Sequence, residues 1–103
     1  MKLYIYSLDG CPYSMKAENL LKKCNPKIIK VAQSKSEKDY YNKMNDMPTY
    51  PQIFLIDEKI NKKIKIGGYD DVKGLLNNIF KKNSLDYSED DCILLENFFL
   101  NKE

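Results

Sequence analysis

Cys11 is the residue with the clearest chemical potential, and it stands between a glycine and a proline in the stretch DGCPYS. A β-branched and aromatic run, residues 2–8, precedes it and ends at Asp9-Gly10, which predicts a buried strand followed by a turn. Pro12 suits the first position of a helix, because it lacks the amide hydrogen that would have no partner there. We therefore expect Cys11 to be the N-cap residue of a helix.

The N-cap position favours the thiolate form of a cysteine. The backbone amides of Tyr13 and Ser14 are unpaired at the start of the helix, where the positive end of the macrodipole also lies. Such cysteines have pKa values of roughly 3.5–7.5, against about 8.5 for free cysteine. The Ser14 hydroxyl can donate to the sulfur, and Lys16 adds positive charge. These features predict a nucleophilic Cys11; the alternative is a small apolar residue that fills a turn.

Cys24 and Cys92 are the two other cysteines. Cys24 comes thirteen positions after Cys11, about 20 Å along a helix, and a disulfide reaches only about 7 Å between Cα atoms. We expect Cys24 to pack in the core and Cys92 to pack on an apolar helix, although a redox role for Cys92 stays open. The odd number of cysteines, without metal-ligand spacing or any histidine, argues against a zinc site and favours a reducing, cytoplasmic setting.

The length and charge of the chain argue against several classes of function. The chain has 103 residues, 43% of them apolar, which is enough for one modest core, so we expect a single domain over residues 1–103. Its 17 basic residues, all lysine, and 15 acidic residues leave a net charge of +2 with no basic run, so we expect no nucleic-acid partner. No segment is long enough for a signal peptide core or a membrane span, so we expect no membrane partner. We expect a monomer.

The spacing of apolar residues predicts the elements that position Cys11. Strands are expected at 2–8, 27–31, 52–56 and 63–66, the last two forming a hairpin. Helices are expected at 12–24, after a capping box of Ser34 and Glu37, after Asp70 and Asp71, and after Ser88 with Asp91. This order predicts an α/β sandwich with a four-stranded mixed sheet flanked by helices and a right-handed crossover between its parallel strands.

Each predicted helix carries an apolar set. In the first three helices these sets are Ala17, Leu20, Leu21 and Cys24 facing the core; Tyr40, Tyr41 and Met44 on one face; and Val72, Leu75, Leu76, Ile79 and Phe80. In the last helix they occupy most of the circumference: Cys92, Ile93, Leu94, Leu95, Phe98, Phe99 and Leu100. The last helix must therefore dock on the domain or on another chain.

A thiolate without a partner cysteine can still exchange disulfides if a soluble thiol, most obviously glutathione, attacks the mixed disulfide that it forms. A strand followed by CPYS at a helix start, then TYPQIF, then GGYDD at another helix start together resemble a glutaredoxin. The resemblance covers a core of residues 1–83 and leaves 84–103 as a C-terminal helical extension. It implies a thioredoxin-like fold and a glutathione-dependent thiol-disulfide oxidoreductase.

The resemblance also implies roles for single residues. Cys11 matches the catalytic nucleophile, and Ser14 acts beside it as a donor to the thiolate. Tyr50-Pro51 matches a cis-proline dipeptide that turns the Tyr50 backbone toward the cysteinyl part of glutathione. The segment from Gly67 to Asp71 matches the γ-glutamyl subsite, with helix amides for the carboxylate and an aspartate for the ammonium group. The implied glutathione-binding residues are Cys11, Tyr13, Thr49, Tyr50, Pro51, Gly68, Tyr69, Asp70 and Asp71.

Some of these residues could have a purely structural role, and the chain departs from the glutaredoxin pattern. Tyr13 could support the loop, and the two aspartates could simply cap a helix. Ser14 stands where many members have a second cysteine, which removes the intramolecular disulfide. Leu8 stands where a basic residue often holds the glycine carboxylate, so Lys16 or Lys43 would have to substitute, or affinity is lower. Tyr50, in place of a small β-branched residue, would narrow the groove.

Three functional hypotheses follow. The first is an enzyme that reduces protein-glutathione or small mixed disulfides by a monothiol mechanism, with Cys11 as nucleophile and glutathione as co-substrate. The second is a glutathione-dependent dimer, a carrier or sensor, that binds a [2Fe–2S] cluster through Cys11 and glutathione thiolates; Pro12 and Tyr13 differ from the CGFS motif associated with that role. The third is an inactive thioredoxin-fold adaptor. We expect no other metal site.

Overall fold

The strands of the protein are β1 (Lys2–Leu8), β2 (Lys27–Val31), β3 (Gln52–Asp57) and β4 (Lys62–Gly67). They come from a computed structural model that describes residues 1–78 and 87–100, and within this part they form one sheet in the order β2-β1-β3-β4. β1 pairs in parallel with β2 and antiparallel with β3, and β3 pairs antiparallel with β4. The predicted four-stranded mixed sheet is confirmed.

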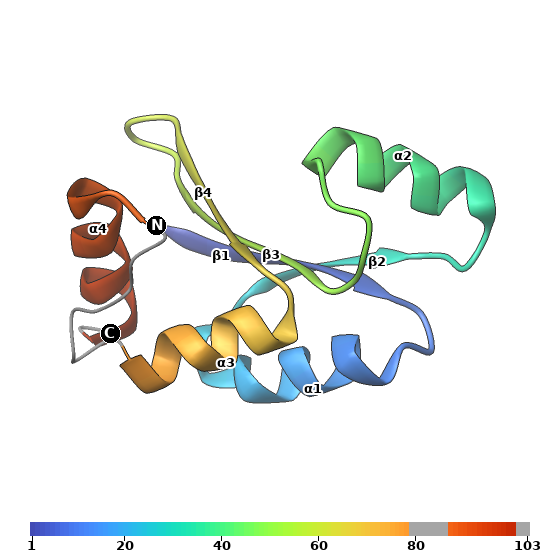
Figure 1. Ribbon diagram of the computed structural model, residues 1–103, viewed down its shortest axis with the longest axis horizontal. Coiled ribbons are helices and arrows are strands. Elements are labelled where there is room, and N and C mark those ends of the chain that lie inside the picture. The colour runs from blue at the N-terminus through green and yellow to red at the C-terminus, as the bar shows by residue number, and fades with distance from the viewer. Residues whose placement is uncertain (79–86, 101–103) are drawn as a thin grey trace.

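Helices cover both faces of this sheet (Figure 1). α1 (Pro12–Leu20) and α3 (Tyr69–Asn78) lie side by side on one face, and α2 (Lys35–Asn45) lies on the other. α4 (Glu89–Leu100) lies at the end of the molecule where β1 begins. The start of α1, which carries Cys11, is at the opposite end of the long axis.

α1 begins as predicted and ends earlier than predicted. Cys11 is the N-cap in an extended conformation, and Pro12 follows at the first helical position. After Leu20 the chain turns into a 3-10 helix, η1 (Lys22–Cys24). The prediction that Leu20 faces the core is wrong, since its side chain is 40% exposed. The buried side of α1 is centred on Ser14, Ala17 and Leu21, and Leu20 lies about 100° around the helix from Leu21.

α2 follows its predicted cap. The Glu37 amide donates to the Ser34 hydroxyl at 3.4 Å, while the Glu37 carboxylate accepts from the Ala32 amide at 3.0 Å, so the box extends back to the strand exit. Tyr41 packs against Tyr6 of the sheet with ring centroids 5.4 Å apart. Tyr40 and Met44 are exposed, because they lie on the flank of the helix that faces away from the sheet.

α3 and α4 complete the core. In α3, Val72 and Leu75 are buried and Leu76 is half-buried; the predicted positions Ile79 and Phe80 lie outside the described residues, as does the predicted boundary after residue 83. In α4, Leu95 and Phe99 are buried in the same cluster as Leu3 and Ile5 of β1, so this helix docks on the domain.

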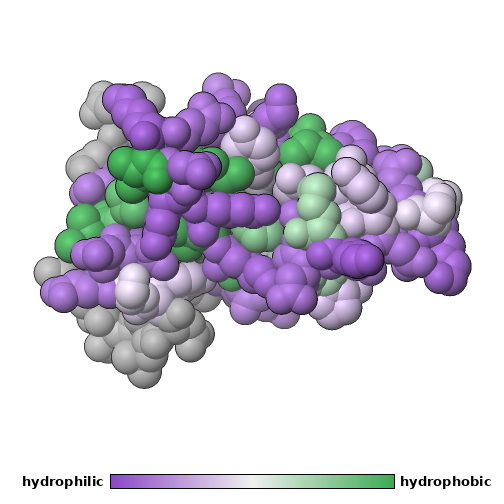
Figure 2. All heavy atoms as spheres, turned by 90° about the horizontal axis from the view of Figure 1, so that it is seen from above, coloured by the Kyte–Doolittle hydropathy of each residue, from purple (hydrophilic) through white to green (hydrophobic). Residues whose placement is uncertain are grey.

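Polar contacts fix α4 at this position. Asp91 of α4 pairs with Lys62 of β4 at 3.0 Å, and the Tyr87 hydroxyl donates to the Ile66 carbonyl at 3.3 Å. The Ser88 hydroxyl accepts a hydrogen bond from the Asp91 amide and so caps α4, as predicted. Seen from the α2 side, hydrophilic side chains cover most of α2, and hydrophobic ones gather toward the α4 end (Figure 2). Among the described residues, no helix has the length and apolar content needed to cross a bilayer.

Candidate active site

Cys11 lies between the end of β1 and the start of α1. Its amide donates to the Leu8 carbonyl at 3.1 Å, and its carbonyl accepts from the Met15 amide at 3.1 Å. Gly10 just before it has a φ of 74°, a left-handed conformation that favours glycine. The thiol is half-buried at the N-terminus of the helix, as the sequence predicts.

The pKa of the Cys11 thiol lies below its ordinary value. Partial burial opposes this shift, because it penalises the charged form. The Ser14 amide, the Ser14 hydroxyl and the Tyr13 amide favour the thiolate form, and together they outweigh the burial, so the pKa is lowered. The thiolate fraction at neutral pH is therefore larger than in a free cysteine, which is what a nucleophilic thiol requires.

The Ser14 hydroxyl is oriented by the backbone. Ser14 is fully buried, and its Oγ accepts from the Leu8 amide at 3.0 Å. A hydroxyl has one proton, and this acceptor contact leaves that proton for the Cys11 sulfur. Leu8 lacks the basic side chain seen in many relatives, but its amide positions the serine that replaces the second cysteine.

A groove of about 580 Å³ opens beside Cys11 and runs along α2. It is lined by Leu8, Cys11, Gln33, Lys35, Lys38, Asp39, Asn42, Pro48, Thr49 and Tyr50. Of these, only Cys11, Thr49 and Tyr50 were among the predicted site residues; most of the others come from α2 and the segments on either side of it. A signal for them exists in the sequence: β1 and β2 are parallel, so the residues after β2 reach the same edge of the sheet as Cys11.

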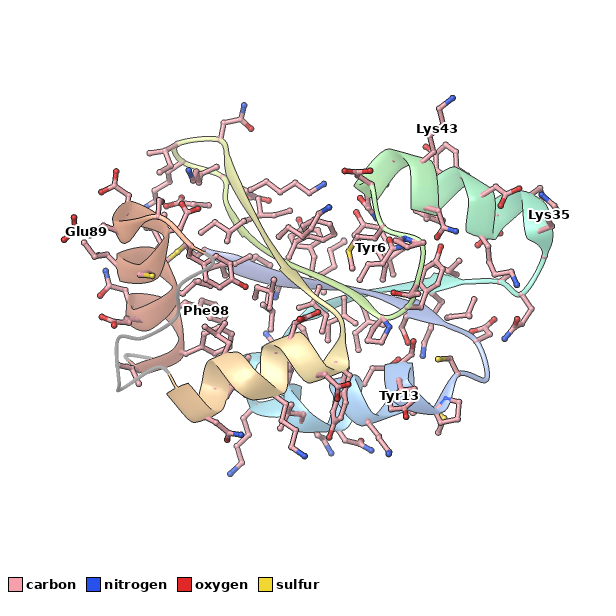
Figure 3. All side chains as sticks on the ribbon, viewed as in Figure 1. Tyr6, Tyr13, Lys35, Lys43, Glu89 and Phe98 are labelled. Carbon is pink, nitrogen blue, oxygen red and sulfur yellow. The ribbon has the colours of Figure 1, made fainter. Side chains whose placement is uncertain are left out.

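The lysines that line the groove, Lys35 and Lys38, are not the two that the sequence suggested. Neither of the expected substitutes for a basic residue at position 8 lines it: the Lys16 ammonium lies 5.1 Å from the Tyr13 ring centroid, and Lys43 points away from α2 into solvent (Figure 3). Lys35 is paired with Asp39 at 2.6 Å, which raises the pKa of Lys35. Lys38 forms no ion pair within the described part of the chain.

The Tyr50-Pro51 bond is cis, as the resemblance implies. Tyr50 lines the groove, and its hydroxyl donates to the Lys38 carbonyl at 3.2 Å, so its ring is tied to α2. Thr49 lines the same groove, and Pro51 is buried behind it. This loop therefore forms the wall of the groove that faces Cys11.

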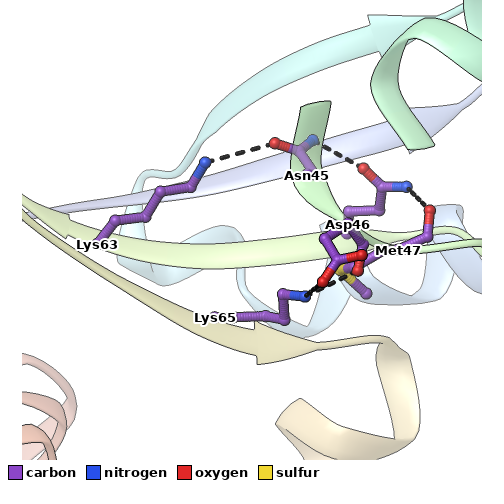
Figure 4. Close-up of polar contacts among 6 residues, drawn as sticks. Asn45, Asp46, Met47, Lys63 and Lys65 are labelled. Atoms are coloured by element: carbon purple, nitrogen blue, oxygen red, sulfur yellow. Dashed lines mark hydrogen bonds and ion pairs between the residues drawn. The ribbon is translucent and has the colours of Figure 1, made fainter. Parts of the chain in front are cut away.

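A buried amide network supports this loop, and nothing in the sequence singled it out. Gln52 is fully buried at the start of β3. Its side chain accepts a hydrogen bond from the Asn45 side-chain amide at 2.8 Å and donates one to the Met47 backbone carbonyl at 3.1 Å. Two lysines of β4 extend the network to the end of α2, with Lys63 donating to Asn45 at 3.4 Å and Lys65 to the Asp46 carbonyl at 2.8 Å (Figure 4).

The predicted γ-glutamyl subsite lies at the start of α3. Asp71 accepts from the Gly68 amide at 2.8 Å, so Asp71 caps the helix and that amide is already occupied. Asp70 is exposed, and its carboxylate has no hydrogen-bond or ion-pair partner in residues 1–78 and 87–100. Asp71 is therefore the cap, and Asp70 remains available to a ligand.

The three motifs come together in space. A Cβ placed on Gly68 would lie 3.7 Å from the Pro51 carbonyl oxygen, so the start of α3 is beside the cis-proline. The Tyr69 ring lies 6.1 Å from the Tyr13 ring of α1. Thr49 and Tyr50 share the groove with Cys11. Of the nine predicted glutathione-binding residues, Cys11, Thr49 and Tyr50 line the groove, Gly68 lies beside Pro51, and Tyr13 lies beside Tyr69; their contact with glutathione stays a prediction.

The other cysteines lie elsewhere. Cys24 is half-buried in η1 and packs against the core, as predicted. Cys92 is in α4, at the other end of the molecule from the start of α1, and its thiol contacts the Tyr87 carbonyl at 3.9 Å. All three cysteines belong to the described residues, and none of them forms a disulfide. Neither Cys24 nor Cys92 is placed to resolve a disulfide of Cys11.

Comparison with known proteins agrees with this geometry. The family model for glutaredoxin matches residues 3–60, more than half of the chain. The chain belongs to the glutaredoxin family. Glutaredoxin 1 from Francisella tularensis, solved with cacodylate, is 25% identical with a TM-score of 0.53, over 79% of this chain and 98% of that one. Comparison with the curated proteins found no match.

Two further glutaredoxin structures are similar. The dithiolic glutaredoxin from Trypanosoma brucei brucei is 26% identical with a TM-score of 0.52, over 75% of this chain and 78% of that chain. A buckwheat glutaredoxin-glutathione complex is 18% identical with a TM-score of 0.52, over 74% and 68% of the two chains, and at that identity it supports the fold alone. Membership in this family makes glutathione-dependent thiol oxidoreductase the general class of the protein.

Proposed function

We propose that this glutaredoxin reduces protein-glutathione and small mixed disulfides by a monothiol mechanism. The observation that carries the proposal is the environment of Cys11: this residue lines the groove at a helix N-terminus, and Ser14, which helps to lower the pKa of the thiol, stands where a second cysteine would otherwise stand. This arrangement favours the thiolate and leaves it without an intramolecular partner. A soluble thiol must then complete the reaction.

In the first step, the Cys11 thiolate attacks the glutathionyl sulfur of the mixed disulfide. A bond forms between Cys11 and glutathione, the substrate disulfide breaks, and its electron pair leaves with the target thiolate. The hydrogen bonds from Ser14 and Tyr13 hold the attacking sulfur charged before the reaction. The leaving thiolate takes its proton from solvent.

In the second step, the thiolate of another glutathione attacks the glutathionyl sulfur held on Cys11. Glutathione disulfide forms from the substrate's glutathionyl group and one free glutathione, and Cys11 returns as a thiolate, so one free glutathione is consumed for each target thiol released. The same donors that stabilise the attacking Cys11 thiolate also stabilise it as the leaving group.

We propose one orientation for glutathione in the groove. The cysteinyl backbone would pair with the Tyr50 backbone in the manner of a β-strand. Lys38 is our candidate for the glycine carboxylate, because it lines the groove without an ion-pair partner among the described residues. Asp70 is our candidate for the γ-glutamyl ammonium group, because Asp71 is occupied by the Gly68 amide.

The direct test is turnover of a glutathione mixed disulfide by the purified chain with excess glutathione. We expect the wild type and Cys92→Ser to turn over at similar rates and Cys11→Ser to be inactive. Substantial activity of Cys11→Ser would contradict the proposal. We also propose a cytoplasmic monomer with residues 1–103 as one domain; the [2Fe–2S] hypothesis stays a prediction.

A further inference from the structure

Two tyrosines and two lysines form an exposed surface on α1 and α3, which we call the tyrosine–lysine surface: Tyr13, Lys16, Tyr69 and Lys73. Tyr13 is 54% exposed at the start of α1 (Figure 3), and its ring lies 6.1 Å from that of Tyr69. The Lys16 ammonium lies 5.1 Å from the Tyr13 centroid and 6.0 Å from the Tyr69 centroid, and that of Lys73 lies 5.9 Å from Tyr69. None of the four lines the groove.

The charge of this surface is not compensated within the described part of the chain. Four lysines of β2, α2 and β4 pair with a carboxylate, namely Lys30, Lys35, Lys62 and Lys65. Lys16 and Lys73 form no such pair in residues 1–78 and 87–100. Their ammonium groups are instead held near tyrosine rings, which positions the charge and does not neutralise it.

The carboxylates nearest in sequence are engaged elsewhere. Glu18 of α1 accepts from Ser7 and pairs with Lys30 at 2.9 Å. Asp71 caps α3 through the Gly68 amide, and Asp70, in the first turn, is the proposed contact of the γ-glutamyl ammonium group. The lysines of the tyrosine–lysine surface therefore remain available to an anionic partner.

The position of this surface relates it to the substrate. Tyr13 follows Cys11 by two residues, so the tyrosine–lysine surface begins beside the thiol. In disulfide exchange the leaving sulfur departs in line with the attack, on the side of the glutathionyl sulfur away from Cys11. The target protein therefore lies outside the groove, at its rim. With glutathione running from Lys38 of α2 to Asp70 at the start of α3, as proposed above, the tyrosine–lysine surface lies next to this path on α1 and α3.

We propose that the tyrosine–lysine surface binds the protein half of the mixed disulfide and favours targets with aspartate or glutamate beside the modified cysteine. The exposed Tyr13 and the half-buried Tyr69 provide aromatic contact area, and lysines without an ion pair provide complementarity to acidic chains. This inference rests on the proposed deglutathionylation, because it concerns the second substrate of that same reaction.

Three glutathionylated peptides that differ only in the residues beside the cysteine test it: one with glutamates, one with serines and one with lysines. A small mixed disulfide of glutathione and 2-mercaptoethanol reports the chemistry without a peptide. For the wild type we expect kcat/KM to be about fivefold or more higher for the glutamate peptide than for the serine peptide, and lowest for the lysine peptide. The preference falls as salt is raised, since both lysines are near the surface.

The variant K16Q/K73Q removes both charges, and K22Q/K23Q is the matched control, because Lys22 and Lys23 are exposed lysines of η1 outside the surface. We expect K16Q/K73Q to lose the preference for the glutamate peptide and K22Q/K23Q to keep it. A preference that is missing from the wild type, unchanged in K16Q/K73Q, or lost equally in the control would overturn the inference while small-substrate turnover stands. No turnover of any substrate would overturn the proposed function and this inference with it.

Discussion

The Leu8 amide donates to the Ser14 hydroxyl at 3.0 Å, and that hydroxyl helps to lower the pKa of the Cys11 thiol. The backbone of β1 is thereby linked to the ionisation of the thiol through a serine that is fully buried. Ser14 also occupies the position at which many relatives carry their second cysteine. The residue that removes the intramolecular disulfide thus supports the remaining thiolate.

Replacing Ser14 with alanine removes this donor. Because the Ser14 hydroxyl lowers the pKa of Cys11, Ser14→Ala should raise that pKa, so the pH dependence of alkylation by iodoacetamide shifts upward. The Leu8 amide also loses its acceptor in a buried site, which should lower the free energy of unfolding by about 1–3 kcal/mol. An unchanged alkylation profile would contradict the role of the hydroxyl. Ser14→Cys is the control that keeps a donor, and it should permit a disulfide between Cys11 and the introduced thiol.

Lys38 should affect glutathione binding more than lysines on the far side of α2. Lys38→Ala should raise the KM for glutathione about three- to tenfold with a small effect on kcat, since one charge-assisted contact is lost. Lys43→Ala is the matched control, because Lys43 points away from the groove. Equal KM values for the two variants in steady-state assays would show that Lys38 does not contact the carboxylate.

Gly67 should be intolerant of a side chain. Its φ is 119°, in the region that favours glycine, and a Cβ there would collide with the Asp71 carboxylate that caps α3. Gly67→Ala should lower the free energy of unfolding by about 1–3 kcal/mol and weaken glutathione binding. Gly74→Ala, inside α3 with open space around its Cβ position, should stabilise the protein by about 0.5–1 kcal/mol. Denaturant unfolding of both variants checks the contrast.

Glu18 should make the stability depend on acid pH. Partial burial of the Glu18 carboxylate raises its pKa, but hydrogen bonds from Ser7 and Lys30 outweigh this effect and lower the pKa below its ordinary value. A lowered folded-state pKa stabilises the protein above the unfolded pKa, and this stabilisation is lost as the pH falls through the folded pKa. Glu18→Gln should therefore be less stable than the wild type near pH 7, by about 1–2 kcal/mol.

The difference between Glu18→Gln and the wild type should then shrink as the pH falls below the pKa of an ordinary glutamate. Denaturant midpoints measured at several pH values give this comparison. A difference that stays constant down to about pH 2–3 would indicate packing in place of ionisation. Lys30→Met provides a second variant, because it removes the Glu18 partner and retains the carboxylate.

Local sequence rules were sufficient for the elements and for the thiol. A strand, a glycine and a Cys-Pro pair determine an N-cap through backbone geometry alone, and the structure has that cap. Leu20 was misplaced because apolar spacing cannot tell which of two adjacent stripes faces the core, and the buried Ser14 moves the stripe of α1 toward Leu21.

The polar contacts of the site required tertiary structure. The sequence could not single out Lys38, because Lys16, Lys38 and Lys43 are equivalent in sequence, and only the docking of α2 beside the cis-proline loop brings Lys38 to the wall of the groove. The difference between Asp70 and Asp71 depends on one hydrogen bond to Gly68. The Gln52 network was missed because a single glutamine in an apolar strand carries no local signal.

The central claim, a monothiol mechanism on Cys11, is tested most directly by mass spectrometry of the intermediate. The reduced chain is mixed with one equivalent of a glutathionylated peptide in the absence of glutathione. We predict one glutathione per chain, located on Cys11 by peptide mapping, together with an equal amount of free peptide thiol, and complete loss of the adduct when glutathione is added. Glutathione on Cys24 or Cys92, a disulfide within the chain, or no adduct with intact substrate would contradict the mechanism.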